Sequence, residues 1–489
     1  MNRRKLSMRT VPMSDNVVPD IFLSANRFGI RLGLERMTEL AGILGNPQEG
    51  LSCYHVAGTN GKGSVVSFIA ASLAASGKKV GVYTSPYLER FSERIRILDG
   101  REGLVRYRTN DAYGEISATA LEKIGDRISK AVGQMIESGS EHPTEFELVT
   151  AAAFIYFREH KCDCVVLETG LGGRLDSTNI ISRPICSIIT ALGYDHMDRL
   201  GSSIEEIATE KAGIIKSGCP VFFMSPYDTT LSPDDAREAE AVISEICARR
   251  GSGLTIVSQT DILERIPSEA GQELRFRFMA ESRVHIRFIG RHQALNAALA
   301  ARAMVVHGLS GEQVAEGLSE AVWKGRNEII SSEPTIILDG AHNPQGMESF
   351  CAAVNESFGR RFTENPPRLI MGVMSDKDYD LMIRVMLRTV SFPFREVICV
   401  TVRQERSLSA ERLAEAFREA AKSENKFYNR IPSMYNVQGK ILISEDANAA
   451  FRDAVSRSRD DGAPLLCVGS LYLVGQVRSV FFENREEMD

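Results

Sequence analysis

The sequence has little of what membrane and nucleic-acid-binding proteins carry. No stretch of about 18 apolar residues occurs in the 489-residue chain, which excludes a transmembrane helix of ordinary length. Basic residues form no long run, and the net charge of −6 disfavours non-specific binding to nucleic acid. Repeats and low-complexity tracts are also lacking. What remains is a globular protein with small-molecule partners, and its length predicts roughly two or three domains.

The nine cysteines are scattered and odd in number, which disfavours a disulfide framework. We therefore expect reduced thiols and a cytoplasmic protein. The basic start, Met1 to Lys5, is not followed by the apolar segment of a signal peptide. Cys162 and Cys164 are two residues apart on a predicted strand and would share one face of it. We interpret them as small buried hydrophobes rather than metal ligands.

One stretch, Tyr54 to Ser64, has the sequence YHVAGTNGKGS. It predicts a short apolar strand, a glycine-rich turn and the start of a helix. Its glycines let backbone N–H groups approach an anion, and the positive end of the helix points at the same place. Lys62 adds a point charge there. The stretch therefore predicts a phosphate site.

This stretch differs from the standard P-loop expression, which requires Gly where Val56 stands and Ser or Thr where Gly63 stands. The structural alternative is an ordinary strand-to-helix turn. Lys62 argues against that alternative, because a cation at a helix N-terminus is unfavourable unless an anion binds there. The residues that we expect to bind the phosphates of a nucleotide are Thr59, Asn60, Gly61, Lys62, Gly63 and Ser64.

Further polar residues stand at the ends of short apolar runs that predict parallel strands. Ser85, Glu168 and His196 are three of them. Because ligands bind beyond the carboxyl ends of parallel strands, these side chains should approach the phosphate site, where Glu168 suits a magnesium ion. Simpler interpretations exist for two residues. His196 alone is typical of a surface histidine, and Lys211 could merely complement the dipole of the helix that it ends.

The strand and helix pattern starts again near residue 330, which predicts two α/β domains. We expect an N-terminal domain at 1–330 with a P-loop-type parallel sheet. The C-terminal domain, at 331–489, should be doubly wound and Rossmann-like. A hinge near 328–334 would join them, and Asp339 and His342, at a strand end of the second domain, would face the cleft between the domains.

Two regions interrupt the pattern of the first domain. Residues 98–141 are polar, and we predict a surface excursion that is irregular at first and then helical. Residues 227–287 predict a helix followed by antiparallel strands.

Taken together, the motifs resemble one family, the folylpolyglutamate synthase and dihydrofolate synthase branch of the Mur ligase superfamily. The match runs from LGLERM at 32–37 to GSLYLVG at 469–475 and so covers nearly the whole chain. GTNGKGS at 58–64 separates this branch from the peptidoglycan ligases, which usually carry Thr after the Lys. The resemblance implies an ATP- and magnesium-dependent ligase that adds L-glutamate to a folate-type carboxylate through an acyl phosphate.

The resemblance also implies a role for each matching residue. Nucleotide contacts would come from the phosphate turn and from Asn296, Arg326 and Asp339. Two magnesium ions would be held by Ser85, Glu168, His196 and a carbamylated Lys211. Phe146 and Asp176 match pterin-side positions, and His342 matches a glutamate contact. The residues implied in catalysis are Lys62, Glu168, His196, Lys211 and His342.

Three features depart from the family pattern. The family usually has His where Tyr87 stands and Pro where Lys324 stands, and the stretch from Asp99 to Tyr113 is longer than expected. The sequence leaves open whether the chain makes dihydrofolate, extends folates with further glutamates, or does both. Two other hypotheses are a ligase for a different acid and a nucleotide-binding regulatory protein without ligase activity. We expect a monomer, since the two domains of one chain can close the cleft.

Overall fold

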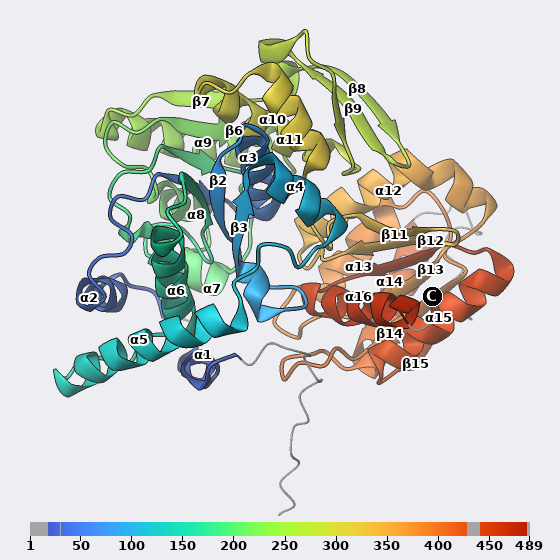
Figure 1. Ribbon diagram of the computed structural model, residues 1–489. Helices are drawn as coiled ribbons and strands as arrows, with labels where there is room; N and C mark the ends of the chain where they lie inside the picture. Colours follow the sequence, from blue (N-terminus) through green and yellow to red (C-terminus); the bar gives the residue numbers. More distant parts are fainter. Residues whose placement is uncertain (1–17, 30, 428–440, 487–489) are drawn as a thin grey trace, which may run out of the picture.

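The computed structural model describes residues 18–29, 31–427 and 441–486. The basic start, Met1 to Lys5, lies outside the described residues. Two α/β bodies lie side by side, an N-terminal one drawn from blue to yellow and a C-terminal one in orange and red (Figure 1). Each contains a sheet in which most neighbouring strands are parallel. The predicted fold class is therefore confirmed.

The larger N-terminal sheet has the strand order β3-β2-β4-β1-β5-β6-β7. Strand β3 runs antiparallel to β2, and the other neighbours pair in parallel. The strands are short and apolar because helices cover both faces. Their bounds are β1 (Cys53–Ala57), β2 (Lys79–Tyr83), β3 (Ile95–Asp99), β4 (Cys164–Glu168), β5 (Cys186–Ile189), β6 (Val221–Met224) and β7 (Leu254–Val257).

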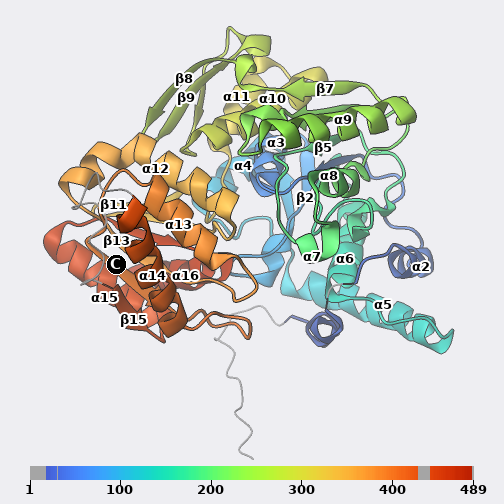
Figure 2. The ribbon, with the colours of Figure 1, turned by 180° about the vertical axis from the view of Figure 1, so that it is seen from behind.

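Helices α3 and α10 pack on one face of this sheet, and α6, α8 and α9 pack on the other (Figures 1 and 2). In α3, every residue after Lys62 is buried, so that this helix runs through the middle of the domain. The helices of the domain are α1 (Asp20–Ala25), α2 (Glu35–Ile43), α3 (Lys62–Ala75), α4 (Gly100–Thr109), α5 (Ala118–Glu137), α6 (Glu145–Glu159), α7 (Met197–Leu200), α8 (Ile204–Ala212), α9 (Pro233–Arg250), α10 (Arg291–Val306) and α11 (Gly311–Glu320).

Strand β4 lies between β1 and β2, although it follows both in the sequence. Val56 of β1 pairs with Glu168, and Tyr83 of β2 pairs with Leu167. The end of β4 is thus placed between the phosphate turn that follows β1 and Ser85, which follows β2. This strand order brings polar residues from three separate parts of the sequence to one edge of the sheet.

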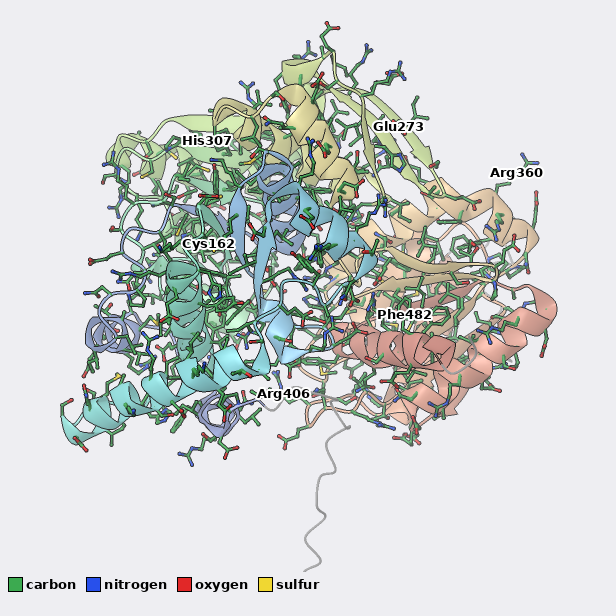
Figure 3. The ribbon with its side chains drawn as sticks, viewed as in Figure 1. Cys162, Glu273, His307, Arg360, Arg406 and Phe482 are labelled. Atoms are coloured by element: carbon green, nitrogen blue, oxygen red, sulfur yellow. The ribbon has the colours of Figure 1, made fainter. Side chains whose placement is uncertain are left out.

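The region 98–141 is more regular than we predicted. Strand β3 pairs along its length with β2, and α4 follows it before α5 begins. The prediction of an irregular start was wrong, because residues 100–109 form helix α4. Glu115 of the same region is held by Arg96, which is 5% exposed. Cys162, labelled in Figure 3, lies in the turn before β4, so the predicted strand begins only at Cys164.

Residues 227–287 hold the predicted helix, α9, and the predicted antiparallel strands. These strands form a small sheet of β8 (Ile262–Ser268), β9 (Gly271–Phe276) and β10 (Val284–Ile286). It reaches over towards the C-terminal domain (Figure 1), where Arg265 pairs with Glu356. Strand β7 corrects the prediction, because it pairs in parallel with β6 and extends the large sheet.

The C-terminal sheet has the order β11-β12-β16-β13-β14-β15, and β11 is its antiparallel edge. Helices α12, α13 and α14 cover one face, and α15 and α16 cover the other. The strands are β11 (Glu328–Ser332), β12 (Thr335–Asp339), β13 (Arg368–Met371), β14 (Glu396–Val400), β15 (Ile441–Ser444) and β16 (Leu465–Val468). The helices are α12 (Pro344–Glu364), α13 (Tyr379–Thr389), α14 (Ala410–Phe427), α15 (Ala447–Asp461) and α16 (Leu471–Glu486).

The hinge predicted at 328–334 was wrong, because residues 328–332 are strand β11 and pair with β12. The pattern was missed since β11 is short and half-buried, with a bulge between Ile329 and Ser331. The domain boundary at residue 330 stays a prediction. Among the described residues, no helix combines the length and the apolar character needed to cross a membrane.

Candidate active site

A cavity of about 810 Å³ lies between the two domains, beyond the carboxyl ends of the parallel strands of both sheets. It brings together residues that are far apart in sequence, such as Asn60 and Asn343, which are 283 positions apart. The predicted site residues that line it are Thr59, Asn60, Gly61, Lys62, Gly63, Ser64, Ser85, Glu168, His196, Lys211, Asn296, Arg326, Asp339 and His342. Phe146 and Asp176 are not part of its wall.

The phosphate turn is held closed by the neighbouring strand β5. The N–H groups of Thr59 and Asn60 both donate to the carbonyl of Ala191, at 2.8 and 3.2 Å. Anion binding is therefore left to the N–H groups of the first turn of α3. Gly61 adopts φ +88°, and a Cβ there would lie 2.5 Å from Asn296 Oδ1. The turn requires glycine at this position for its conformation and for the close approach of Asn296.

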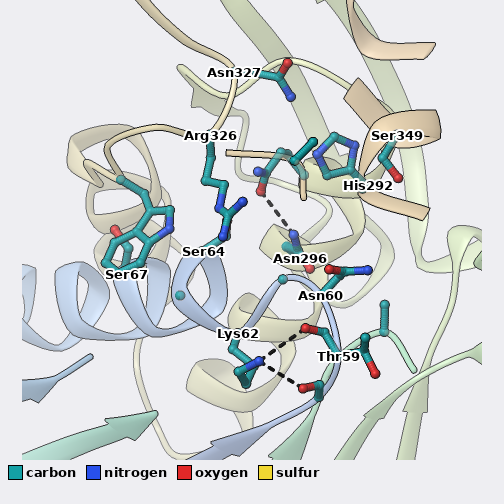
Figure 4. A pocket seen from close by; sticks show the side chains of 18 of the residues that line it. Thr59, Asn60, Lys62, Ser64, Ser67, His292, Asn296, Arg326, Asn327 and Ser349 are labelled. Carbon is teal, nitrogen blue, oxygen red and sulfur yellow. Dashed lines mark hydrogen bonds between the residues drawn. The ribbon is translucent and has the colours of Figure 1, made fainter. Parts of the chain in front are cut away.

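Lys62 and Arg326 bring positive charge to the start of α3. Lys62 Nζ donates to the carbonyls of Gly58 and Thr59, at 3.0 and 3.2 Å, which folds the side chain back over the turn. Burial lowers the pKa of Lys62, while the charges of Glu168 and Asp195 oppose that shift. Arg326 enters the cavity from the C-terminal side and points towards the same helix start (Figure 4). The start of α3 and the segment between α11 and β11 thus supply the cations for one anion site.

Glu168 is a buried carboxylate at the wall of this cavity. It is 4% exposed, and its Oε2 accepts the backbone N–H of Ser85 at 3.2 Å. Burial raises the pKa of Glu168 to about 7, although Lys62 pulls it down. The hydroxyl of Thr169 next to it is buried and has no hydrogen-bond partner among the residues that the structure describes. Such an under-coordinated carboxylate is the kind of group that a cation would stabilise.

The donor set around Glu168 fits magnesium better than a transition metal. Within residues 18–29, 31–427 and 441–486, no group of three or more His, Cys, Asp and Glu side chains is arranged to hold a metal. Magnesium usually takes one or two carboxylates and fills its other positions with water and substrate phosphates. Glu168, the Ser85 hydroxyl and His196 around a phosphate turn suit that mode of binding.

His196 and Asp195 follow β5, but they have different functions in the structure. His196 has the left-handed conformation, with φ 51°, which is uncommon for a residue other than glycine and points to a functional constraint. Asp195 accepts from Asn343 Nδ2 and Lys377 Nζ, both at 3.1 Å. Burial would raise the pKa of Asp195, but His196 and Lys377 hold it well below its usual range. Asp195 thus links the domains, a role that the sequence did not indicate.

Lys211 ends α8 inside the protein rather than at its surface. It is 3% exposed and lines the cavity. Burial, reinforced by the charge of Lys62, lowers the pKa of Lys211 to about 7. A lysine that served only to complement a helix dipole would gain by staying charged and solvated. The observed environment favours the neutral amine, which argues against that simpler interpretation.

On the C-terminal side, Asp339 ends β12 and His342 follows in the next turn, so both lie at the carboxyl end of the strand, as predicted. Asp339 accepts the backbone N–H groups of Asn327 and Ala341, both at 2.7 Å, and burial raises its pKa. His342 Nδ1 lies 2.8 Å from the carbonyl of Gly340 and must donate to it. That bond leaves Nε2 with a lone pair, 3.8 Å from a carboxylate oxygen of Asp195. Burial, aided by the charge of Arg326, lowers the pKa of His342 to about 4, so that the ring is neutral at pH 7.

Asn327 is a cavity residue that the sequence patterns did not reveal. It is 2% exposed, lines the cavity, and has φ 48°. Both polar atoms of its side-chain amide are buried, and neither has a hydrogen-bond partner within the described part of the chain. A buried amide without partners is unfavourable unless a ligand satisfies it. Asn327 lies beside Arg326 at the cavity (Figure 4), and no local sequence signal marks it, because the contact of its backbone N–H is with Asp339 at the end of β12.

Phe146 and Asp176 lie behind the wall of the cavity. Asp176 accepts from the N–H groups of Gly170, Leu171 and Thr178 at 2.8 to 3.0 Å, and from the hydroxyl of Thr178 at 2.6 Å. These bonds shape the turn after β4. The ring of Phe146 packs where a Cβ of Gly170 would be, at 2.5 Å. Contact of either residue with a pterin stays a prediction.

The Mur ligase middle domain family matches residues 114–304, and the Mur ligase glutamate ligase domain family matches residues 325–471. The dihydrofolate synthase/folylpolyglutamate synthase of Bacillus subtilis (strain 168) is 37% identical over 371 residues, covering 73% of this chain and 79% of that protein. The folylpolyglutamate synthase of Lacticaseibacillus casei is 32% identical over 462 residues, covering 92% and 94%. The structure of Mycobacterium tuberculosis folylpolyglutamate synthase complexed with ADP has a TM-score of 0.77 and 26% identity, covering 94% and 98%.

The protein is an ATP-dependent ligase of the Mur type. This class is defined by the phosphate turn in one α/β domain, the second α/β domain across the cleft and the matches to the Mur ligase domains. Similarity to the whole-length relatives narrows that class. The chain belongs to the folylpolyglutamate synthase and dihydrofolate synthase family. The resemblance drawn from the motifs is thereby confirmed.

Proposed function

We propose that this chain uses ATP to join L-glutamate to the carboxylate of a folate-type acid. One observation carries the proposal. The phosphate turn, Glu168 and Lys211 of the N-terminal domain face the same cavity as His342 of the C-terminal domain. A protein that only bound a nucleotide would not need a second set of polar residues across the cleft. Because one chain supplies all of these residues, the active form in this proposal is a monomer.

Ligation takes two transfers in this proposal. A carboxylate oxygen of the acid attacks the γ-phosphorus of ATP, ADP leaves, and an acyl phosphate forms. The amine nitrogen of glutamate then attacks the acyl carbon, loses a proton and expels phosphate, which leaves an amide. Both steps bring several negative charges into one small space. The main task of the protein is therefore to neutralise and position those charges.

The first transfer uses the residues around the start of α3. The N–H groups of the first helical turn and Ser64 bind the phosphates, and Lys62 turns from the backbone carbonyls to the γ-phosphate. Arg326 neutralises charge from the opposite wall of the cavity. Asn296 and Asp339 hold the nucleoside. Magnesium, held by Ser85, Glu168 and His196, would supply further charge neutralisation of the phosphates.

The second transfer uses the neutral ring of His342. Glutamate arrives as an ammonium, and its nitrogen must lose a proton before it can attack. Since Nδ1 of His342 is committed to Gly340, Nε2 is free to accept a hydrogen bond from that nitrogen. The acid lies against the loop after β2, where the half-exposed ring of Tyr87 lines the cavity. Phe146 and Asp176 support this side from behind.

Lys211 is the residue that we propose to be carbamylated. A neutral amine takes up carbon dioxide and becomes an anion, which could hold a second magnesium ion where an ammonium would repel it. The pKa of about 7 supports the neutral form. Lys211→Ala should therefore lose activity and regain part of it with short carboxylic acids, whereas the exposed Lys123→Ala should do neither. A folded Lys211→Ala variant that no acid rescues would contradict the carbamate.

The acceptor decides among the reactions of the family. We would measure ADP release with ATP, magnesium and glutamate, and supply dihydropteroate or tetrahydrofolate as the acid. Turnover with dihydropteroate alone identifies a dihydrofolate synthase, turnover with tetrahydrofolate alone a folylpolyglutamate synthase, and turnover with both a bifunctional enzyme. ADP release that depends on neither acid would overturn the proposal for folate and favour another acceptor.

A further inference from the structure

A buried cluster of charged side chains joins the two domains beside the cavity. It connects the loop after β2, the segment between β3 and α5, the residues before β11, and helix α16. We call it the ion cluster. Its members are Glu89, Arg90, Glu93, Arg96, Asp111, Glu115, Lys324, Glu328 and Arg478.

Lys324 lies at the centre of the ion cluster. Its Nζ lies 2.7 Å from Asp111, and 3.3 Å from both Glu89 and Glu93. The side chain is 7% exposed, so these carboxylates are its main partners rather than water. Burial works against its charge, but the carboxylates outweigh it and raise the pKa of Lys324. The lysine is therefore a fixed cation with several anchors.

One anchor of Lys324, Glu93, is itself part of the wall of the cavity. Glu93 also accepts the N–H groups of Leu88 and Glu89, at 2.8 and 3.3 Å, and so closes the loop that presents Ser85 and Tyr87. On the other side, Lys324 is two residues from Arg326, which points at the start of α3. Lys324 thus ties the loop after β2 to the segment that carries Arg326.

Asp111 comes from the segment 99–113, and its carboxylate lies 2.7 Å from Lys324 Nζ. Arg478 of α16 lies 3.0 Å from Asp111 and 2.6 Å from Glu89, and its guanidinium lies over the ring of Phe482. The segment 99–113 therefore supplies a carboxylate that compensates the lysine, and α16 joins the same network.

We propose that Lys324 is a positioning residue that fixes the loop after β2 relative to Arg326, and that Asp111 supplies negative charge that stabilises the buried ammonium of this lysine. The inference rests on the proposed function, in which this loop receives the acid and Arg326 contacts the phosphates. Lys324 acts through those residues and need not touch either substrate. Removing it frees both sides of the contact and leaves Asp111, Glu89 and Glu93 with excess negative charge.

The test compares Lys324→Met, Asp111→Asn, the double variant and Lys324→Arg with the exposed Lys123→Met as control. Backbone hydrogen exchange should rise in residues 84–94 and 321–327 together in Lys324→Met, and stay at the wild-type level around 341–346. In steady-state kinetics, kcat/KM for the acid should fall about 10- to 100-fold, because small displacements of reacting groups cost that much. The KM for glutamate should change less than about twofold.

The double variant should be less impaired than Lys324→Met, because Asp111→Asn removes one of the carboxylates that Lys324→Met leaves unpaired. Lys324→Arg should retain most of the activity. Unchanged exchange in both segments, or effects of the two single substitutions that simply add, would overturn the inference. Exchange does not depend on turnover. An inactive wild type would therefore count against the proposed function alone, whereas an active wild type with unaffected Lys324→Met would count against the inference alone.

Discussion

The two domains meet on both sides of the cavity, and the two junctions are built differently. On one side, Asn60 donates to Gln345 at 2.6 Å, and Asp195 accepts from Asn343 and Lys377 at 3.1 Å. We call this the amide junction. On the other side lies the ion cluster, in which Lys324, Arg478 and several carboxylates are almost fully buried. The amide junction combines single hydrogen bonds with one lysine–carboxylate pair, Lys377–Asp195, whereas the ion cluster is a network of multiply paired charges.

The two kinds of junction predict where the molecule can open. A hydrogen bond between neutral groups, such as that of Asn60 to Gln345, contributes about 0.5–1.5 kcal/mol net and exchanges readily with ligand or water, and only the Asp195 contacts of the amide junction involve charge. Breaking a buried ion pair costs about 3–5 kcal/mol, because it leaves an unpaired charge. We therefore expect the domains to part at the amide junction and to pivot about the ion cluster. Asn60 and His342, which we expect to contact substrates, lie on the side that opens.

The comparison of the two junctions bears on catalysis only if the amide junction borders the reacting phosphate. Lys62 contacts the backbone of the phosphate turn next to Asn60. Lys62→Ala should lower ATP turnover about 10³-fold, since a buried cation aimed at developing charge is worth roughly that much. ADP release measures the effect, and the exposed Lys78→Ala serves as the control. Turnover within a fewfold of wild type, in a protein of unchanged melting temperature, would remove the phosphate assignment.

Glu168→Gln should separate activity from stability. Activity should fall about 100-fold, with a higher magnesium requirement, because the carboxylate is lost as a ligand. In the absence of ligands, the free energy of unfolding of Glu168→Gln should exceed that of the wild type by about 1 kcal/mol above pH 7. Its native pKa of about 7 lies above the ordinary value of 4.5, so the native carboxyl resists ionisation and destabilises the fold as pH rises through that window.

Thermal unfolding of the wild type and Glu168→Gln at pH 4 and pH 8, without nucleotide or magnesium, measures the second effect. The gain should be present at pH 8 and absent at pH 4, where the carboxyl is protonated in both the native and the unfolded state. A variant that is less stable at pH 8 would show that Glu168 holds the apo fold together rather than waiting for a cation.

Lys377→Met should mirror Lys324→Met across the cavity. Lys377 pairs with Asp195 at 3.1 Å in the amide junction, close to the His342 turn. Its loss should raise the KM for glutamate about tenfold and leave the KM for the acid nearly unchanged, the reverse of the pattern expected for Lys324→Met. Steady-state kinetics with each substrate varied in turn provides the measurement. If both variants shift the same KM, the two junctions do not act separately.

The sequence predicted those parts of the site that depend on local order along the chain. A glycine-rich turn between strand and helix, and polar residues directly after apolar runs, marked Lys62, Glu168 and Asp339 as site residues. Parallel strands present their carboxyl ends at one edge, so such residues meet whatever the details of the fold. The same reasoning located the paired α/β domains.

What the sequence did not predict depends on partners that are distant in the chain. Arg96 and Lys324 look like exposed charges until Glu115 and Asp111 are found beside them. Strand β3 was hidden for the same reason. Asp195 could have been noticed from its place after β5, but its contacts with Asn343 and Lys377 come from the other domain. Local sequence patterns predict helices and strands, but they do not predict which charged residues pair across long distances in the chain.

The smallest expected effect concerns Asn327, which lies between the two junctions and belongs to neither. Its side-chain amide has no partner among the described residues, although it is buried at the cavity wall. If a nucleotide group satisfies this amide, Asn327→Ala should weaken ADP binding about 2- to 10-fold, the value of a single neutral hydrogen bond.

The melting temperature of the nucleotide-free Asn327→Ala variant tests whether the amide is unsatisfied when no ligand is bound. Removing an unsatisfied buried amide relieves its desolvation cost, but alanine tolerates φ 48° less well than asparagine does. Asn327→Gly avoids that strain and should leave the free protein at least as stable as alanine does. Titration calorimetry with ADP on both variants separates the two effects. Wild-type affinity in both would show that the amide does not face the nucleotide, and that its partner lies on the side of the ion cluster and the acid.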